Sequence, residues 1–308
     1  MKIISNLRLV TKKNFYSYAL LLMAVAAVTF FSSCKKYEEE NVPGNTAPPD
    51  QTVDGVIIEN YVNKTYISTL GREPDSTEKS FALNLLRTNN LSVSSRYQFL
   101  DSVFVKEEFK DKFYERARID LLQGLDTAEI TFQILLIEFV IIPSITGTPD
   151  SIFIDTYLME RDRLLEMKEI PDSLHAGVIS YREAHRRCVN NSFYDQLNMG
   201  AFNFVVSMFQ HFLNRYPTSN EVTAGVDMVN GSSSVIFLTA GQSKNDFLDI
   251  FFSTKDYYEG QVGVLYRQYL FRDPNTLEMN NGTLLYMNTG DYIQLQKSIL
   301  SLNEYIGI

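Results

Sequence analysis

The sequence predicts an all-α protein, a helical array of short-helix modules in tandem, because one motif recurs three times with a helix stop in every copy. The motif is aromatic-x3-Leu-x-Arg-x-Pro-x3-Glu, with the same internal spacing each time. A proline disfavours helical backbone in the residue before it, so each copy ends one helix and opens a turn. The three copies are Tyr66, Leu70, Arg72, Pro74 and Glu78; Phe209, Leu213, Arg215, Pro217 and Glu221; and Tyr266, Leu270, Arg272, Pro274 and Glu278.

A helix start follows each proline directly. Asp75, Thr218 and Asn275 each stand three residues before the glutamate of their motif. In a capping box the first side chain accepts a hydrogen bond from a free N–H of the new helix, and the glutamate accepts one from the N–H of the capping residue. The three glutamates therefore have a structural explanation, and we do not predict them to be catalytic acids.

The motif arginines Arg72, Arg215 and Arg272 fall in the turn between two helices. A guanidinium there suits the C-terminal end of the first helix, whose last carbonyls carry partial negative charge. It is also placed to pair with a carboxylate of the next helix. Ligand binding is the alternative, and it would require the three arginines to converge.

The modules end alike as well. Residues 104–109, 252–257 and 300–305 each combine polar or acidic residues with a terminal aromatic, while the segments between start and end vary in length. No proline separates the second module from the third, so one continuous helix is predicted over 255–271. The predicted divisions are helical module 1 (56–124), a helical insert (125–200), helical module 2 (201–258) and helical module 3 (259–308).

These residues resemble a bacterial helical repeat of unknown function that begins Y-x3-LGR-x-P and ends in an S-x-EF-like segment. They are also similar to the helical core of phycobilisome linker domains. The first copy, with Leu70-Gly71-Arg72, matches best, whereas Asn214 and Phe271 replace the glycine in the later copies. The resemblance implies three or four short helices per copy and a role in protein–protein organisation, and it supplies no catalytic residues.

The N-terminus has the pattern of a lipoprotein leader. Residues 1–13 are basic, and 19–31 are apolar except for Thr29, which is too short a run for a stable membrane span. Phe31-Ser32-Ser33-Cys34 resembles a bacterial lipobox, although leucine is usual where Phe31 stands. We therefore predict a signal peptide over 1–33 and acylation of Cys34; an uncleaved N-terminal anchor is the alternative.

Residues 34–55 are predicted to form a flexible tether, rich in charge, proline and glycine and poor in apolar residues. Its start, Lys35-Lys36-Tyr37-Glu38-Glu39-Glu40, resembles a signal that sends some lipoproteins to the outer face of the outer membrane. The predicted location is thus the cell exterior, with the periplasmic face as the alternative.

The charge balance excludes one class of partner. The chain has 308 residues and a formal net charge of −9. The leader carries four basic residues and no acidic one, so the remainder holds 24 basic and 37 acidic residues. Nucleic acid needs clustered Lys and Arg, so it is not an expected partner. Adhesion to an anionic bilayer through basic patches is not expected either, and the predicted contact with the membrane is the N-terminal lipid.

The predicted insert contains three helices. A charged helix over 110–123 leads into a strongly apolar stretch, 126–140. This stretch is predicted to be a buried helix that is too short to span lipid and is ended by Pro143 and the Gly147-Thr148-Pro149 cluster. Further helices are predicted over 151–168 and 172–190. Their expected packing partner is module 1.

The insert also holds the densest polar cluster, residues 181–188, with His185 and Cys188 on one helix face. A Cys–His nucleophile pair is conceivable, but such pairs usually stand on different elements. One His and one Cys are two ligands short of a closed zinc site. If Cys34 is acylated, Cys188 has no disulfide partner, and it is predicted to be a small buried side chain, with a reactive thiol as the alternative.

The connector 190–200 is rich in amides and turn formers and is predicted to lead into the helix from Ala201, with a polar rim for sugar or peptide as the alternative. No phosphate loop, H-E-x-x-H, C-x-x-C or G-x-S-x-G is present, and no cofactor or metal is predicted. The leading hypothesis is a non-enzymatic surface lipoprotein that binds or scaffolds a protein partner in the cell envelope. The alternatives are a glycan- or peptide-binding accessory lipoprotein and a polymer-acting hydrolase.

Overall fold

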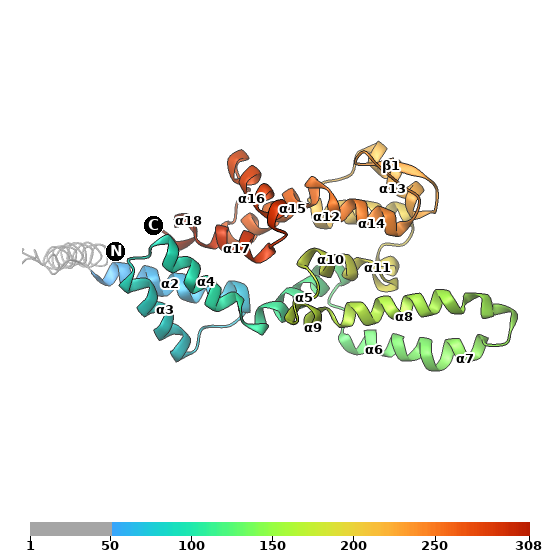
Figure 1. The fold of residues 1–308 in the computed structure, drawn as a ribbon, viewed down its shortest axis with the longest axis horizontal. Coiled ribbons are helices and arrows are strands. Elements are labelled where there is room, and N and C mark those ends of the chain that lie inside the picture. The colour runs from blue at the N-terminus through green and yellow to red at the C-terminus, as the bar shows by residue number, and fades with distance from the viewer. Residues whose placement is uncertain (1–50) are drawn as a thin grey trace, which may run out of the picture. The chain divides into compact units, whose positions relative to one another are not determined.

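The computed structural model describes the backbone of residues 51–308 and the side chains from residue 55 onward. Over this segment the chain is an array of short helices with one small β-hairpin, so the predicted all-α class is confirmed (Figure 1). The predicted signal peptide and Cys34 lie outside the described residues. The first described helix begins at Gln51, so the last residues of the predicted tether 34–55 are helical.

The first motif joins two helices that pack on each other, α2 and α3, and α2 also packs on α5. Asp75 and Glu78 form the predicted capping box at the start of α3. Tyr66 and Leu70 are each 2% exposed, as expected of core contacts. The helices of this segment are α2 (Gln51–Leu70), α3 (Ser76–Thr88), α4 (Val93–Phe104) and α5 (Glu107–Leu122).

The helix predicted over 126–140 is present and ends just before the Gly147-Thr148-Pro149 cluster, but it is not a buried helix and it continues past Pro143. The helix continues to Ile145 and packs mainly against one neighbour, α8, so most of its surface has no cover. Pro143 lies inside it, directly after a π-helical segment whose altered hydrogen bonding accommodates the missing N–H. Its parts are α6 (Thr127–Leu136), the π-helical η1 (Ile137–Ile141) and α7 (Ile142–Ile145).

The return limb of this hairpin is a 3₁₀ turn followed by a long helix, in agreement with the predicted helix 151–168. The prediction of a single helix over 172–190 is wrong. The first helix ends at His175, with Ala176 as its C-cap, and Ser180 caps a new helix. The elements are η2 (Pro149–Phe153), α8 (Ile154–Lys168), α9 (Ile170–His175) and α10 (Tyr181–Val189). Both α9 and α10 pack on α5, the last helix of predicted module 1.

The second motif again joins two helices, and Thr218 and Glu221 form the predicted capping box. The connector 190–200 includes a short helix, α11, capped by Asn191. In the hairpin, Ser234 pairs with Gly241 in an antiparallel register. The elements are α11 (Ser192–Leu197), α12 (Ala201–Leu213), α13 (Ser219–Val229), β1 (Ser234–Ile236), β2 (Thr239–Gly241) and α14 (Lys244–Ser253).

The predicted continuous helix over 255–271 is confirmed as α15, which is capped by Thr254 and ends at Leu270. It packs on α12, which carries the start of the second motif, and on α16, which follows the third motif, so it contacts both modules. Asn275 and Glu278 form the third capping box. The elements are α15 (Lys255–Leu270), α16 (Thr276–Thr289), α17 (Tyr292–Leu300) and α18 (Asn303–Ile306).

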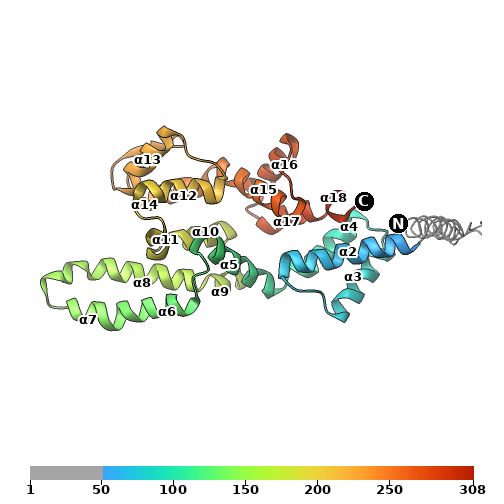
Figure 2. The same cartoon turned by 180° about the vertical axis from the view of Figure 1, so that it is seen from behind.

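The end of the chain packs against the beginning of the described segment. Helix α18 lies on α2 and α17 lies on α4, which the views from both sides show (Figures 1 and 2). The Arg96 guanidinium donates to the carbonyl of Ser301 at 2.9 Å and to Asn303 Oδ1 at 2.7 Å. Module 1 and module 3 therefore contact each other directly, although they are separated by the insert and by module 2.

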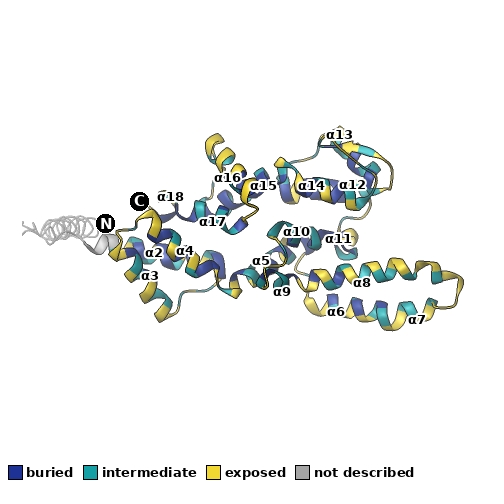
Figure 3. Ribbon diagram, viewed as in Figure 1, coloured by how far each residue is buried: buried dark blue, intermediate teal, exposed yellow. Residues whose placement is uncertain are grey.

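The core is rich in Phe and Tyr side chains, which supply large apolar surface in a chain that has no tryptophan. Phe212 of α12 lies edge-on to Phe251 and Phe252 of α14, and Tyr257 of α15 continues the cluster. Buried residues follow the facing sides of the helices, whereas the hairpin of α6, α7 and α8 is largely exposed or intermediate (Figure 3).

Candidate functional site

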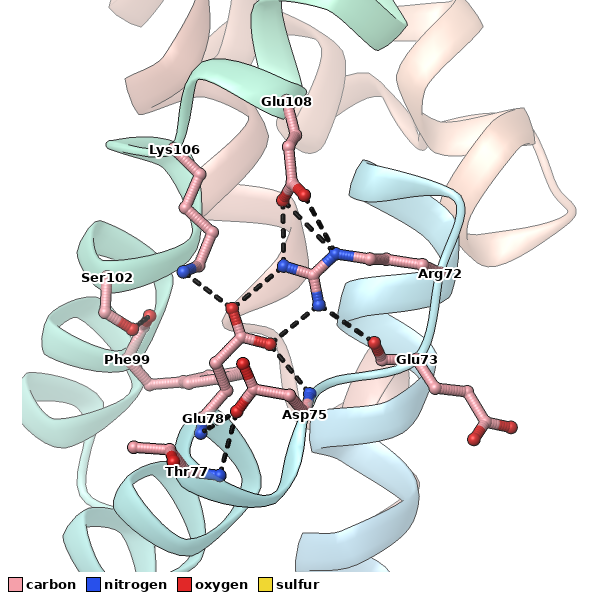
Figure 4. A network of polar contacts seen from close by, with 9 residues as sticks. All are labelled: Arg72, Glu73, Asp75, Thr77, Glu78, Phe99, Ser102, Lys106 and Glu108. Carbon is pink, nitrogen blue, oxygen red and sulfur yellow. Dashed lines mark hydrogen bonds and ion pairs between the residues drawn. The ribbon is translucent and has the colours of Figure 1, made fainter.

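Each motif arginine is bound by two carboxylates. In the first copy the Arg72 guanidinium donates to both oxygens of Glu78, at 2.7 and 2.9 Å, and to Glu108 at 2.8 Å (Figure 4). Lys106 adds an ion pair to Glu78 at 2.7 Å. Arginine and lysine together hold the pKa of Glu78 at about 2. We call this group of an arginine and two carboxylates a motif knot.

The other two copies repeat the motif knot. Arg215 binds Glu221 through both terminal nitrogens and reaches Asp256 at 2.8 Å. Arg272 binds Glu278 in the same way and reaches Glu304 at 2.6 Å. The second carboxylate always stands one residue before the aromatic that ends a module, so the knot ties the start of a module to its end.

The residue before the arginine adopts the left-handed conformation in all three copies, although it is Gly71, Asn214 and Phe271 in turn. Their φ angles are 73°, 52° and 57°. The replacement of glycine therefore leaves the turn geometry intact. Phe271 accepts a conformation that costs a side chain with a Cβ roughly 1 kcal/mol or more.

The guanidinium of each motif arginine also lies over the motif aromatic. The distances to the ring centres are 5.6 Å for Arg72 and Tyr66, 4.9 Å for Arg215 and Phe209, and 5.4 Å for Arg272 and Tyr266.

Each arginine bonds only within its own knot and turn, and no ion pair links two knots in the part of the chain that the structure describes. The alternative of three converging arginines at one ligand site is not supported by this geometry.

His185 and Cys188 share helix α10 but form no hydrogen bond with each other. His185 Nδ1 lies 2.9 Å from the hydroxyl of Tyr257, and burial lowers the pKa of His185 to about 4. Cys188 is fully buried, and burial raises the pKa of its thiol to about 12. A thiol with that pKa stays protonated at neutral pH, which suits the predicted packing role and opposes a reactive thiolate.

Other charged residues of this cluster pair locally. Arg186 binds Asp249 at 2.8 Å, and Arg187 binds Glu183 at 3.2 Å on the same helix. No group of three or more His, Cys, Asp and Glu side chains that could hold a metal ion occurs between residues 55 and 308.

The most distinctive surface is the hairpin of α6, η1, α7, η2 and α8, residues 127–168, which we call the arm. Ile130, Ile134 and Ile137 face inward and are at most 5% exposed. Phe132 and Phe139, on the other side of the same helix, are 65% and 70% exposed. Further exposed apolar residues of the arm are Leu135, Val140, Ile152, Phe153 and Met159.

The outer limb of the arm is long and apolar enough to cross a membrane. Thr127–Ile145 is 19 residues long with a mean hydropathy of 1.8, and only 17% of this stretch is buried. The apolar helix predicted from residues 126–140 was too short to cross a membrane, but the observed helix is longer because it continues past Pro143. By contrast, the return limb α8 carries Asp155, Asp162 and Glu166, which a lipid interior does not accept readily.

The arm has more acidic than basic residues, and its basic residues Arg161, Arg163 and Lys168 all stand in the second half of α8. Between residues 119 and 160 the sequence has seven acidic residues and neither lysine nor arginine. Glu138 pairs with Arg161 across the hairpin at 3.6 Å, while Glu129 stays exposed beside the apolar face. The exposed face is thus apolar with acidic borders.

The connector 190–200 is built as a local cap. Asn191 is fully buried, and its side chain bonds the carbonyls of Arg187 and Cys188 and accepts from the N–H of Tyr194. The side-chain amide of Asn191 therefore already has partners for both its nitrogen and its oxygen. They favour the predicted connector over a polar rim for sugar or peptide.

No protein-family model, curated protein or solved structure matches the chain. The resemblance to the bacterial LGR-x-P repeat and to phycobilisome linker modules therefore stays a prediction that rests on the motif residues.

Proposed function

We propose that the protein is a non-catalytic scaffolding component of the cell envelope that docks a protein partner on the outer face of its arm. One observation carries the proposal: a long apolar helix is held out from the helical array with only one face covered. Contiguous exposed apolar surface is characteristic of interaction sites. The arm has a packed base, because α8 packs on α9 and α10, and both of these helices pack on α5.

The partner has a definite chemistry. A helix face that exposes Phe132, Leu135 and Phe139 at three- and four-residue steps suits a complementary apolar helix or groove. The acidic borders of the arm call for Lys or Arg around that surface in the partner. A bilayer is a poorer fit for two reasons. Insertion of the arm would also place the charged side chains of α8 in lipid, and anionic headgroups repel an acidic arm.

In this proposal the chain is held at the outer membrane by acyl groups on Cys34. That anchor rests on the leader sequence. It is tested by labelled palmitate in growing cells: incorporation is expected in the full chain and lost in Cys34→Ser. Protease added to intact cells distinguishes an exterior location from the periplasmic face.

The docking experiment uses the full-length chain in its own cells, with a photo-crosslinking amino acid in place of Phe139. The same group at Phe81, an aromatic that is 54% exposed on α3, is the matched control. A discrete protein adduct at 139 and none at 81 is expected, and Phe132→Ser combined with Phe139→Ser should abolish copurification of that protein. The complex should also weaken as ionic strength rises.

Three results would overturn the proposal. A dimer of this chain at position 139 would make the arm a self-association surface. Adducts with lipid alone would make it a membrane contact. Equal labelling at both positions would remove any special role of the arm.

A further inference from the structure

A partly open cavity of about 110 Å³ lies where four parts of the chain meet. Its walls come from α5 of module 1, α10 of the insert, α12 of module 2, and α15 and α17 of module 3. None of the residues of the arm lines it, so this space is separate from the proposed docking face. Its volume has room for several waters or one small organic molecule.

Two buried glutamines of the cavity wall have hydrogen-bonding groups without partners. Gln296 is 2% exposed, and its Nε2 has no hydrogen-bond partner, while its Oε1 accepts from the hydroxyl of Tyr269 at 2.5 Å. Gln261 is 3% exposed, and its side chain makes no hydrogen bond within residues 55–308. Nε2 of Gln296 has no accessible surface, whereas the unpartnered amide of Gln261 lines the cavity. A buried amide donor without an acceptor is costly, so the Gln261 amide points to an oxygen-bearing molecule in the space beside it.

Two opposite charges face the same cavity without pairing. Arg116 and Asp120 stand one helical turn apart on α5, yet they form no ion pair with each other or with another residue from 55 to 308. Arg116 donates one hydrogen bond, to the carbonyl of Ser68 at 2.5 Å. The exposed Asp120 marks the mouth of the cavity, next to His211.

The titratable groups around the cavity give it no net charge at neutral pH. Burial lowers the pKa of His185 to about 4 and lowers that of His211, so both imidazoles are neutral. Burial also raises the pKa of Asp120, against the opposing effect of Arg116 and His211. One cation and one anion therefore face the space. The rest of the wall includes the aromatic side chains Phe113, Phe212 and Tyr292.

We infer that this cavity binds a small zwitterion of the amino acid class. The carboxylate accepts from Arg116 and from the side-chain amide of Gln261, and the ammonium group donates to Asp120 at the mouth. The aromatic wall then covers the apolar part of the ligand. A neutral sugar would satisfy the amides but would leave both charges without partners, so the zwitterion is the better complement.

The test is isothermal titration calorimetry on the purified full-length chain. The probes are the twenty L-amino acids, together with acetate, methylamine, glucose and N-acetylglucosamine. Saturable binding of at least one amino acid is expected, with acetate and methylamine each far weaker. Asp120→Asn should weaken that binding about tenfold or more, since it removes a charge-assisted contact.

Glu115→Gln is the matched control, because it makes the same carboxylate-to-amide change on α5 at a residue that does not line the cavity. Its affinity should equal that of the unaltered chain. Asp120 is exposed, so its variant is expected to fold, and circular dichroism checks this. Absence of binding by every amino acid, binding of a monosaccharide instead, or an unchanged affinity in Asp120→Asn would each overturn the inference.

Discussion

The Arg72 guanidinium binds both oxygens of Glu78, and it thereby joins the C-terminal end of α2 to the first turn of α3. Glu78 Oε2 also accepts from the N–H of Asp75 at 2.8 Å. One carboxylate thus completes the capping box and holds the arginine. This double use explains why arginine and glutamate keep a fixed spacing in all three copies of the motif.

Glu78→Gln should lower the free energy of unfolding by about 1–3 kcal/mol, because a charged hydrogen-bond acceptor is lost and Arg72 keeps only Glu108. Urea denaturation of the full-length chain measures the change. Glu73→Gln is the control, since the carboxylate of the exposed Glu73 makes no hydrogen bond or ion pair with residues 55–308. Equal effects in the two variants would contradict a special role for Glu78.

The motif knots should also make the fold sensitive to acid. Arginine holds the pKa of Glu78 and that of Glu221 at about 2, whereas an unfolded glutamate titrates near 4.3. A depressed folded pKa contributes stability that is complete above about pH 5 and is lost as pH falls toward 2. Chemical denaturation at stepped pH should show this loss. In Glu78→Gln combined with Glu221→Gln the slope should be shallower, and an unchanged slope would refute the assignment.

Part of each motif knot could be predicted from the sequence: the capping box, and the pairing of the arginine with a carboxylate of the next helix. Proline, capping residue and glutamate lie within five positions, so backbone chemistry alone indicates the turn. The second carboxylate is more distant in the chain: Glu108 lies 36 residues after Arg72. It stands in the repeated module end, and the spacing of the motif alone does not connect that end with the arginine.

Burial of the arm could not be predicted in the same way. The alternation of Ile130, Ile134 and Ile137 with Phe132 and Phe139 makes the helix apolar on all sides, which is typical of a core helix. Whether a second layer covers the outer side depends on distant contacts that no local pattern records. The cavity could not be predicted from the sequence either, because Gln261 and Gln296 stand on different helices that only the fold brings together.

The β-hairpin was also unpredictable from its turn residues. Phe237 and Leu238 both adopt positive φ, at 49° and 63°, in the two-residue turn between β1 and β2. That turn normally selects Asn-Gly or a similar pair. Phe237 lies stacked on Phe209 at 5.8 Å between ring centres, so packing against the second motif offers compensation for the turn strain.

Gly260→Ala should destabilise the fold by about 1–3 kcal/mol or more. A Cβ at Gly260 would stand 1.9 Å from the carbonyl oxygen of Phe212, so α12 and α15 would have to separate. Gly263→Ala on the same helix is the control. Its Cβ would meet only the flexible Arg267 side chain, at 3.3 Å, and alanine favours the helix. Thermal denaturation should show a lower Tm for the first variant and an equal or higher one for the second.

Phe271→Gly should stabilise the protein by about 0.5–1 kcal/mol. Phe271 has a φ of 57° and is 84% exposed, so glycine relieves backbone strain at little cost in packing. Asn214→Gly changes the equivalent position of the second motif and should have a smaller effect, because asparagine tolerates this conformation. Urea denaturation compares the two, and a loss of stability in Phe271→Gly would mean that its ring makes an essential contact.

The two sides of the arm helix should respond oppositely to substitution. Ile134→Ala removes a side chain that is 5% exposed and packed between α6 and its neighbours, so about 2–4 kcal/mol of stability should be lost. Phe139→Ser removes a ring that is 70% exposed, and the free energy of unfolding should change by less than about 0.5 kcal/mol. Copurification of a partner should show the reverse order, with Phe139→Ser the more damaging change. If Phe139→Ser also unfolds the chain, its ring is needed for folding and the arm is not a free docking face.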